Sequence, residues 1–280
     1  KVEGLLGGHS GQDIDKERQN ADLLMARTIQ RLLKETKGQL VSFNGGTKDN
    51  AIPRECEASL IYESDEEAAK AEELACELAE TYAEELTPAE PDFSCEISCE
   101  TNRTAEAIPQ DAAKEFICAM RLAPNGIQKR NIKMDGFVVV SLNLGVVRTE
   151  EDRIVMIFSP RSSVASLQED TKERLNTLAE TFGFTVSHSS EYPGWSFKED
   201  SPVREICKES YKELFGEDLK IEAIHAGLEC GLFSDAIKGL DAIAIGPTIA
   251  NCHTPDEYLT LDSFERFYEF LKDILSRLAK

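Results

Sequence analysis

A short motif occurs twice in this chain of 280 residues, and it restricts the fold more than any other feature of the sequence. The segments VSFNGG, at 41–46, and VSLNLG, at 140–145, are near copies that lie 99 residues apart. A second pair, LAETY at 78–82 and LAETF at 178–182, repeats at an offset of 100 residues. Two matches in the same order at almost the same offset indicate that one supersecondary unit is duplicated.

Each predicted copy follows the order β-α-β-β-α-β, which folds as an antiparallel sheet with two helices on one face. For the first copy, the apolar spacing predicts strands at 2–6, 39–43, 57–62 and 93–99 and helices at 20–34 and 66–85. For the second copy, it predicts helices at 109–122 and 167–181 and strands at 136–142, 154–158 and 185–189. Residues 1–190 are therefore expected to form one α+β domain.

The pattern changes after the turn-rich stretch 189–202, which we interpret as a linker. Residues 200–280 are expected to form an α/β domain with a helix at 203–215, strands at 220–227 and 240–246, and a closing helix capped by Asp262 or Ser263. The predicted buried face of that helix consists of Phe264, Phe267, Phe270, Leu271, Ile274 and Leu278. Two strands are fewer than such a sheet needs, so this domain is expected to be partial.

The charge of the chain argues against two kinds of partner. With 52 acidic and 31 basic residues, the formal net charge is −21, and such a surface repels nucleic-acid backbones and anionic membranes. We therefore expect no nucleic acid and no membrane as partners. No apolar run reaches the roughly 18 residues needed to cross a bilayer, and the eight scattered cysteines are typical of free thiols in a cytoplasmic protein.

Three segments carry side chains suited to chemistry. His9 lies in GGHSG, where glycines let a ligand approach the backbone and an imidazole can donate to a developing negative charge, although a surface histidine without a role explains this segment equally well. In HAGLECG, a strand runs into a glycine turn that carries His225 and Glu229, and such strand ends often hold sites. His253 is a candidate metal ligand, but a catalytic zinc needs about three protein ligands.

Taken together, the motifs resemble one family. GLLGGHSGQDI, RQNA, NGGTKDNAIPRE, SLNLGVVR, HAGLECGLF and GPTIANCHTPDE occur in this order, and they are similar to segments of the aminoacylhistidine dipeptidases, carnosinase-like zinc metallopeptidases of the bacterial cytosol. The resemblance implies a catalytic α/β domain with two metal ions, interrupted by a lid domain. The duplicated block would be that lid, with its two copies arranged like the subunits of a dimer, and residues 200–280 would be part of the catalytic zinc-peptidase domain.

The resemblance also implies roles for individual residues. His9 would close over the active site and stabilise the oxyanion of the tetrahedral intermediate, and Asn50 would contact the substrate. Arg161 would clamp the terminal carboxylate of the substrate, which suits the planar fork of a guanidinium. The first copy has Tyr62 where the second has Arg161, so each copy would supply half of one site.

His225 and Glu229 would line the substrate pocket, and His253 would be the last metal ligand of a zinc site that also accepts manganese or cobalt. The other ligands of the family, an His-x-Asp segment, a bridging Asp, a Glu-Glu pair and a further Asp, have no counterpart in this chain. We therefore expect a fragment that is inactive on its own. Because it starts at Lys1, within a predicted strand, its natural amino terminus is expected to have been left out.

Two functions of different classes remain open at this point. The first is a cytoplasmic metal-dependent dipeptidase that hydrolyses Xaa-His dipeptides such as β-alanyl-histidine (carnosine). The alternative is a non-catalytic binding or assembly module derived from such a peptidase. In both cases the partial sheet would leave an apolar edge uncovered, so the fragment is expected to associate with itself.

Overall fold

The computed structural model describes residues 1–132, 136–189, 193–195, 197–222, 225, 229–250 and 257–279. The chain divides into two compact units, the first formed by residues 1–191 with 224–226 and the second by residues 192–223 with 227–280. No helix in the described part of the chain is long and apolar enough to span a membrane. Seven of the cysteines lie in the described ranges, and these seven are free thiols.

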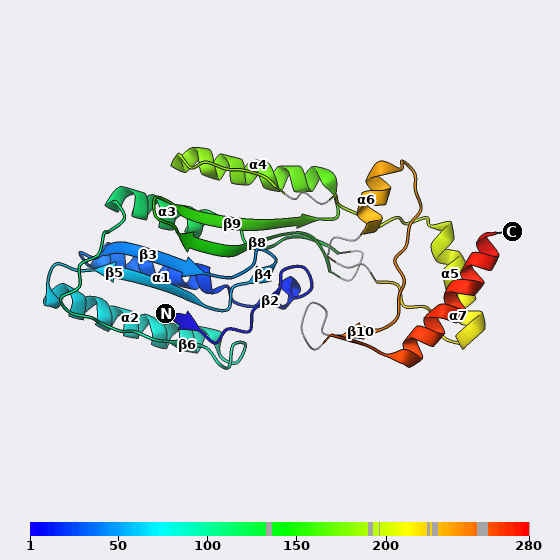
Figure 1. Ribbon diagram of the computed structural model, residues 1–280, viewed down its shortest axis with the longest axis horizontal. Helices are drawn as coiled ribbons and strands as arrows, with labels where there is room; N and C mark the ends of the chain where they lie inside the picture. The colour runs from blue at the N-terminus through cyan, green and yellow to red at the C-terminus, as the bar shows by residue number, and fades with distance from the viewer. Residues whose placement is uncertain are drawn as a thin grey trace. The chain divides into compact units, whose positions relative to one another are not determined.

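The first unit is mixed α/β and is built on a seven-stranded antiparallel sheet (Figure 1). Its strands are β1 (Val2–Glu3), β3 (Gln39–Gly45), β5 (Cys56–Ile61), β6 (Ser94–Cys95), β7 (Gly126–Asn131), β8 (Phe137–Thr149) and β9 (Ile154–Ser162). They lie in the order β6-β1-β5-β3-β8-β7, and β9 also pairs with β8. The short strands β2 (Gly8–His9) and β4 (Ala51–Ile52) form a separate antiparallel pair.

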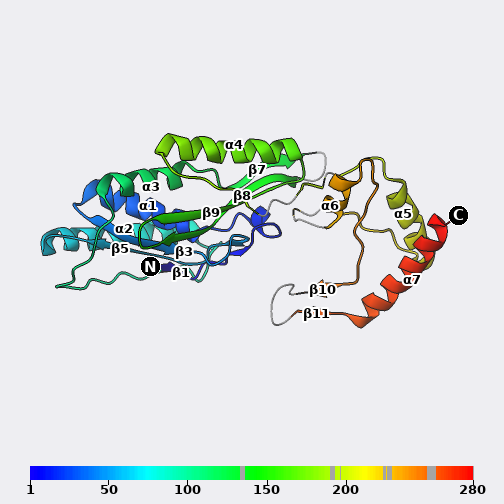
Figure 2. The same ribbon diagram turned by 45° about the horizontal axis from the view of Figure 1, so that its top comes forward.

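Helices cover one face of this sheet (Figure 2). They are α1 (Ala21–Glu35), α2 (Asp65–Leu86), α3 (Gln110–Leu122) and α4 (Ala165–Phe182), and a 3₁₀ turn, η1 (Ile14–Lys16), precedes α1. Neighbouring helices contact one another in the order α2-α1-α3-α4. Asn20 begins α1: its side-chain oxygen accepts hydrogen bonds from the backbone N–H groups of Asp22 and Leu23, while its amide donates to the Leu144 carbonyl of β8 at 2.8 Å. The helix cap is therefore also a link to the sheet.

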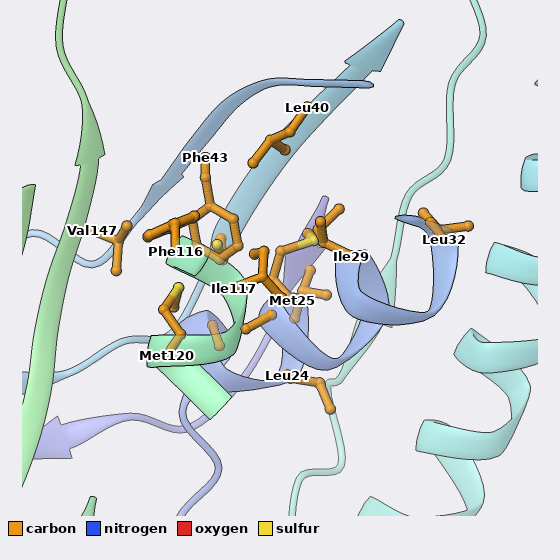
Figure 3. Packing of buried hydrophobic residues seen from close by; sticks show 14 of the residues in the cluster. Leu24, Met25, Ile29, Leu32, Leu40, Phe43, Phe116, Ile117, Met120 and Val147 are labelled. Atoms are coloured by element: carbon orange, nitrogen blue, oxygen red, sulfur yellow. The ribbon is translucent and has the colours of Figure 1, made fainter. Parts of the chain in front are cut away.

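The core of the first unit lies between α1, α3 and the sheet (Figure 3). Phe43 of β3 and Phe116 of α3 meet edge to face, with ring centroids 5.4 Å apart and an interplanar angle of 84°. Ile29 of α1 and Val147 of β8 belong to the same cluster and are each 1% exposed. Burial of each such side chain contributes about 1.5–3 kcal/mol, so truncating Phe43 to alanine would cost about 3–5 kcal/mol.

The two repeated motifs meet in this sheet. Gly45 of β3 pairs with Val147 of β8 in antiparallel register. At the neighbouring position, Gly46 has a φ of +66°, and a Cβ there would lie 1.9 Å from the carbonyl oxygen of Gly145. A residue other than glycine at position 46 would push the two strands apart.

The second unit contains α5 (Pro202–Phe215), α6 (Glu229–Ala236), α7 (Leu261–Leu278) and an antiparallel pair, β10 (Ile249–Ala250) with β11 (Tyr258–Leu259). Its core joins α5 to α7 through Cys207, Phe270 and Ile274. The ring of Tyr211 lies 5.3 Å from that of Phe270, edge to face. Both ends of α5 are fixed locally, since Ser201 caps its start with Pro202 in the first turn and Gly216 ends it in the left-handed conformation.

The predicted helices are confirmed, but several predicted strands are wrong. The first strand ends at Glu3 rather than continuing to residue 6, because Gly4 has a φ of +77° and lies against the Asp92 carbonyl. The strand expected at 93–99 is reduced to Ser94–Cys95, since it pairs only with the short β1. Residues 185–189 form no strand: Val186, the one apolar side chain of this segment, is 43% exposed and buries no strand face.

In the second unit, residues 240–246 are not a strand either, because the apolar run finds no strand to pair with among the described residues. The strand expected at 220–227 lies partly outside the described residues, and 220–222 are irregular. Helix α7 begins directly after Thr260, ahead of the predicted cap. Phe270 and Ile274 are buried on α7 as predicted, whereas Phe264 and Leu278 are 46% and 47% exposed.

Candidate functional site

The glycine-rich turn after β1 places His9 beside the loop that contains Asn50. Strand β2 pairs with β4, so His9 lies opposite Ala51. Nδ1 of the His9 ring accepts hydrogen bonds from the backbone N–H groups of Gly11, at 3.1 Å, and Gln12, at 3.2 Å. Because a neutral imidazole has one donor and one acceptor nitrogen, its proton lies on Nε2. The turn therefore fixes His9 as a hydrogen-bond donor through Nε2.

Gly8 shows why the turn requires glycine. Its φ is +138°, and a Cβ there would lie 2.5 Å from a guanidinium nitrogen of Arg18 and 2.6 Å from Oδ2 of Asp13. The same carboxylate oxygen accepts the backbone N–H of His9 at 2.8 Å. Burial alone would raise the pKa of Asp13, but hydrogen bonds from Lys16 and from the His9 backbone hold it below its ordinary value. Asp13 is thus an anionic anchor for the turn.

Strand β8 holds the loop that contains Asn50. The buried amide of Asn143 donates to the carbonyl oxygens of Asp49, at 3.1 Å, and Ala51, at 2.8 Å. On the other side of the loop, the Asn50 carbonyl accepts the backbone N–H of Ser10 at 2.9 Å. Segments that are far apart in the sequence therefore set the position of Asn50 next to that of His9.

Arg161 of β9 reaches the same region. It lies directly opposite Ser141 of β8 in the antiparallel register, so the two side chains share a face of the sheet. Its Nε donates to Oγ of Ser10 at 3.3 Å. Burial lowers the pKa of the guanidinium, and the negative charge of Asp49 partly offsets this. Among the described residues, no hydrogen-bond partner is found for its two Nη groups, which leaves them available to an anion.

His225 also belongs to the first unit. Its Nε2 lies 2.7 Å from Oγ of Ser141, and the ring of Phe137 packs edge-on at a centroid distance of 6.4 Å. Burial, and then the positive charge of Arg161, lower the pKa of His225 to about 4, while a hydrogen bond to the Val138 backbone acts in the opposite direction. A bond that favours the protonated ring comes from a ring N–H to a carbonyl, which leaves Nε2 to accept from Ser141.

The structure thus brings together four of the six predicted site residues: His9, Asn50, Arg161 and His225. Glu229 is the first residue of α6 and belongs to the second unit. His253 lies outside the described residues. In the ranges that are described, no group of three or more His, Cys, Asp or Glu side chains could hold a metal ion.

Sequence reasoning missed three polar residues that organise the site, Ser10, Ser141 and Asn143. All three are buried polar groups: Ser10 is 0% exposed, and Ser141 and Asn143 are each 1% exposed. The signal for two of them was present, since VSFNGG and VSLNLG share a serine and an asparagine at matching positions. Ser10 had no signal beyond its place next to His9.

The first unit is a mixed α/β layer whose sheet carries a polar site suited to a small anionic ligand. The chain belongs to the peptidase family M20/M25/M40, since the model of this family matches residues 45–277. Together with the two relatives described next, this match confirms the resemblance to the aminoacylhistidine dipeptidases that the sequence motifs indicated.

Two relatives are similar over nearly all of this chain. It is 32% identical over 281 residues to the cytosol non-specific dipeptidase of Escherichia coli (strain K12), covering 99% of this chain and 57% of that protein. A solved structure, the aminoacylhistidine dipeptidase from Vibrio alginolyticus, superposes with a TM-score of 0.88 at 34% identity, covering 99% of this chain and 56% of that one. The chain spans a little over half the length of both relatives.

Proposed function

We propose that this chain is part of a cytoplasmic, metal-dependent dipeptidase that hydrolyses Xaa-His dipeptides such as β-alanyl-histidine. The observation that carries the proposal is the meeting of His9, Asn50 and Arg161 around Ser10. The names of the two relatives support a dipeptidase, and they differ in breadth, since one is called non-specific and the other aminoacylhistidine-specific. We propose the narrower specificity for this protein.

Arg161 would bind the terminal carboxylate of the substrate. Its two Nη groups point two parallel N–H donors at an anion, a geometry that matches both oxygens of a carboxylate. Burial of the guanidinium strengthens this attraction, because fewer water molecules compete for the charge. The neutral His225 beside it adds no second positive charge.

His9 would act on the scissile carbonyl. As water adds to the peptide, the carbonyl oxygen gains negative charge, and an N–H donor that is already oriented stabilises this oxyanion more than it stabilises the ground state. The Nε2–H of His9 has that orientation because Nδ1 is held by two backbone N–H groups. The amide of Asn50 would hydrogen-bond the polar groups of the substrate next to it.

The metal dependence is proposed from family membership. The described residues do not by themselves fit a zinc ion, because they hold no group of three ligand side chains and a catalytic zinc needs about three. His253 remains the one proposed ligand from this chain, with zinc, manganese or cobalt as the metal. No step of the reaction is therefore assigned to the metal.

We also propose that residues 1–190 form a duplicated lid and that residues 200–280 belong to the catalytic domain. The antiparallel pairing of β3 with β8 supports the duplication, since these strands carry the two repeated motifs. The side chains of the matching asparagines both hydrogen-bond to backbone groups, although in opposite directions. Asn143 donates to the Asp49 and Ala51 carbonyls, and Asn44 accepts the backbone N–H of Thr149. Each asparagine thus bonds to the other proposed copy.

The proposal is tested by measuring hydrolysis of β-alanyl-histidine and of dipeptides without histidine, with added zinc. The polypeptide of 280 residues and a version extended upstream of Lys1 are compared. We expect only the extended version to be active, and to prefer Xaa-His substrates. Hydrolysis by the shorter chain alone, or a preference for dipeptides without histidine, would contradict the proposal.

In the active version, we predict that Arg161→Lys raises KM for β-alanyl-histidine by roughly tenfold to a hundredfold, because lysine lacks the fork that binds both carboxylate oxygens. The control is Arg174→Lys, on the exposed side of α4, where the native side chain contacts Gln128. An unchanged KM in the Arg161 variant would exclude the proposed carboxylate clamp.

A further inference from the structure

Ser10 occupies a position that neither the sequence motifs nor the proposed mechanism has explained. Its side chain is fully buried, at 0% exposed, in the glycine-rich turn between His9 and Gly11. A buried hydroxyl is costly unless it is hydrogen-bonded. Here Oγ accepts the Nε–H of Arg161 at 3.3 Å, and the backbone N–H of the same residue donates to the Asn50 carbonyl at 2.9 Å.

These two bonds connect the strand pair β2–β4 to β9. Ser10 directly follows His9, so one residue is linked to the backbones of His9 and Asn50 and to the side chain of Arg161. The partners come from positions 50 and 161, far apart in the sequence. Ser10 therefore adds a direct link between these two positions to the placement that the strand pairing already gives them.

The bond to Nε also decides how Arg161 can meet an anion. A guanidinium offers two edges to a carboxylate, one formed by the two Nη groups and the other by Nε with one Nη. Since Nε is already engaged by Ser10, only the Nη1–Nη2 edge remains for a ligand.

We infer that Ser10 is a positioning residue that holds Arg161 through Nε, so that the terminal carboxylate of the substrate is received at the Nη1–Nη2 edge. This inference rests on the proposed dipeptidase function for its consequence in catalysis, but the contact itself can be tested without activity. Ser10 touches no reacting atom and acts through Arg161.

The first test measures the contact in the polypeptide of 280 residues. In ¹⁵N–¹H spectra, the Arg161 Nε–H signal, assigned by its loss in Arg161→Lys, should exchange slowly with water. We expect Ser10→Ala to speed this exchange by at least tenfold, because alanine removes the acceptor and keeps the backbone bond to Asn50. The matched control is Ser162→Ala, next to Arg161 on β9, where the native hydroxyl bonds to Val164 and to no other residue in the described part of the chain. Equal exchange in both variants would overturn the inference.

The second test measures kinetics in the version extended upstream of Lys1. Ser10→Ala should raise KM for β-alanyl-histidine by about tenfold with kcat changed less than threefold, because a hydrogen bond to a charged group is lost. With β-alanyl-histidinamide, which has no terminal carboxylate, the same substitution should have no effect on KM. In an Arg161→Lys background, Ser10→Ala should add nothing, since both changes then affect one interaction.

The two tests separate two kinds of failure. If no dipeptide is hydrolysed but the Nε–H of Arg161 loses protection in Ser10→Ala, the proposed function fails and the positioning role of Ser10 stands. If hydrolysis depends on Arg161 but the effects of Ser10→Ala and Arg161→Lys simply add, then Ser10 does not act through Arg161 and the inference is wrong. A fall in kcat with an unchanged KM in Ser10→Ala would also refute it.

Discussion

Burial gives His225 and Asp22 opposite dependences on pH. The His225 ring accepts from Ser141 and carries a pKa of about 4, chiefly because burial disfavours its positive form. Asp22, 0% exposed, has its pKa raised to about 7 by burial, although the neighbouring Cys56 thiol lowers it slightly. In each case, burial favours the neutral form.

The pKa of His225 leads to a prediction about acid stability. The ordinary pKa of 6.5 falls to about 4 in the folded protein, so its contribution is complete above pH 6.5 and is lost as the pH falls towards 4. The loss is at most about 3 kcal/mol. Urea unfolding at pH 7 and pH 4.5 should show a smaller acid loss in His225→Gln than in the native chain. The exposed His188→Gln is the control, and equal losses in all three proteins would contradict the assignment.

At the same scale, the sequence predicted much of the site. His9, Asn50, Arg161 and His225 were named from motifs, and they lie in one region of the first unit. Ser10 and the other buried polar residues that connect them were missed, because a serine or asparagine in a turn or a strand looks the same in sequence whether its side chain faces water or a buried partner. Only the packing of distant segments reveals that difference.

At the scale of elements, helices were predicted more reliably than strands. The spacing of apolar residues was enough to predict α1 (Ala21–Glu35), because the backbone hydrogen bonds of a helix lie within the segment and need no neighbouring element. A strand depends on a neighbour that the sequence does not name, which is why residues 185–189 and 240–246 failed as strands and β7 (Gly126–Asn131) was missed. Strand ends also depend on backbone angles, as Gly4 shows for β1.

The contact between α1 and β3 gives a second prediction about pH. Gly45 lets the first turn of α1 approach, since a Cβ there would lie 1.8 Å from Oδ1 of Asp22. Because the folded pKa of Asp22 is about 7 rather than 3.8, its contribution is complete below pH 3.8 and is lost as the pH rises through 7. The loss amounts to about 4 kcal/mol. Asp22→Asn should remove this part of the pH dependence in urea unfolding between pH 4 and pH 8.

Asp152→Asn, in the exposed turn between β8 and β9, is the matched control for that measurement. From pH 4 to pH 8, the stability of the native chain and of this control should fall by about 4 kcal/mol relative to the Asp22 variant, because the contribution of His225 to the pH dependence is common to all three proteins. If all three curves coincide, the carboxyl group of Asp22 does not titrate as described.

At the scale of the molecule, α7 of the second unit carries an uncovered apolar stripe. Its members are spaced by three, four, seven and three residues, which keeps them on one side of the helix, and they are between 46% and 75% exposed: Leu261, Phe264, Tyr268, Leu275 and Leu278. The opposite side of the helix is already used, since Phe270 and Ile274 pack on α5. A stripe of this kind on an amphipathic helix normally lies against another element.

We therefore predict that the polypeptide of 280 residues associates with itself. Light scattering over a range of concentrations should show a mass above that of the monomer, and Phe264→Glu with Leu275→Glu should shift the protein towards the monomer. Ser276→Glu, an exposed position on the same helix, is the control for added charge. A single monomeric species at all concentrations would refute the prediction.

The contact between Gly46 and Gly145 also limits how this protein can change over time. A Cβ at position 46 would lie 1.9 Å from the carbonyl oxygen of Gly145, and a Cβ at position 145 would lie 2.5 Å from the carbonyl oxygen of Asp49, so neither position can acquire a side chain without the facing backbone moving away. The β3 and β8 halves of the sheet are therefore expected to evolve as a matched pair. Exchanging one half for the corresponding segment of a relative should succeed only if that relative has glycine at the junction, whereas exchange of both halves together is free of this restriction.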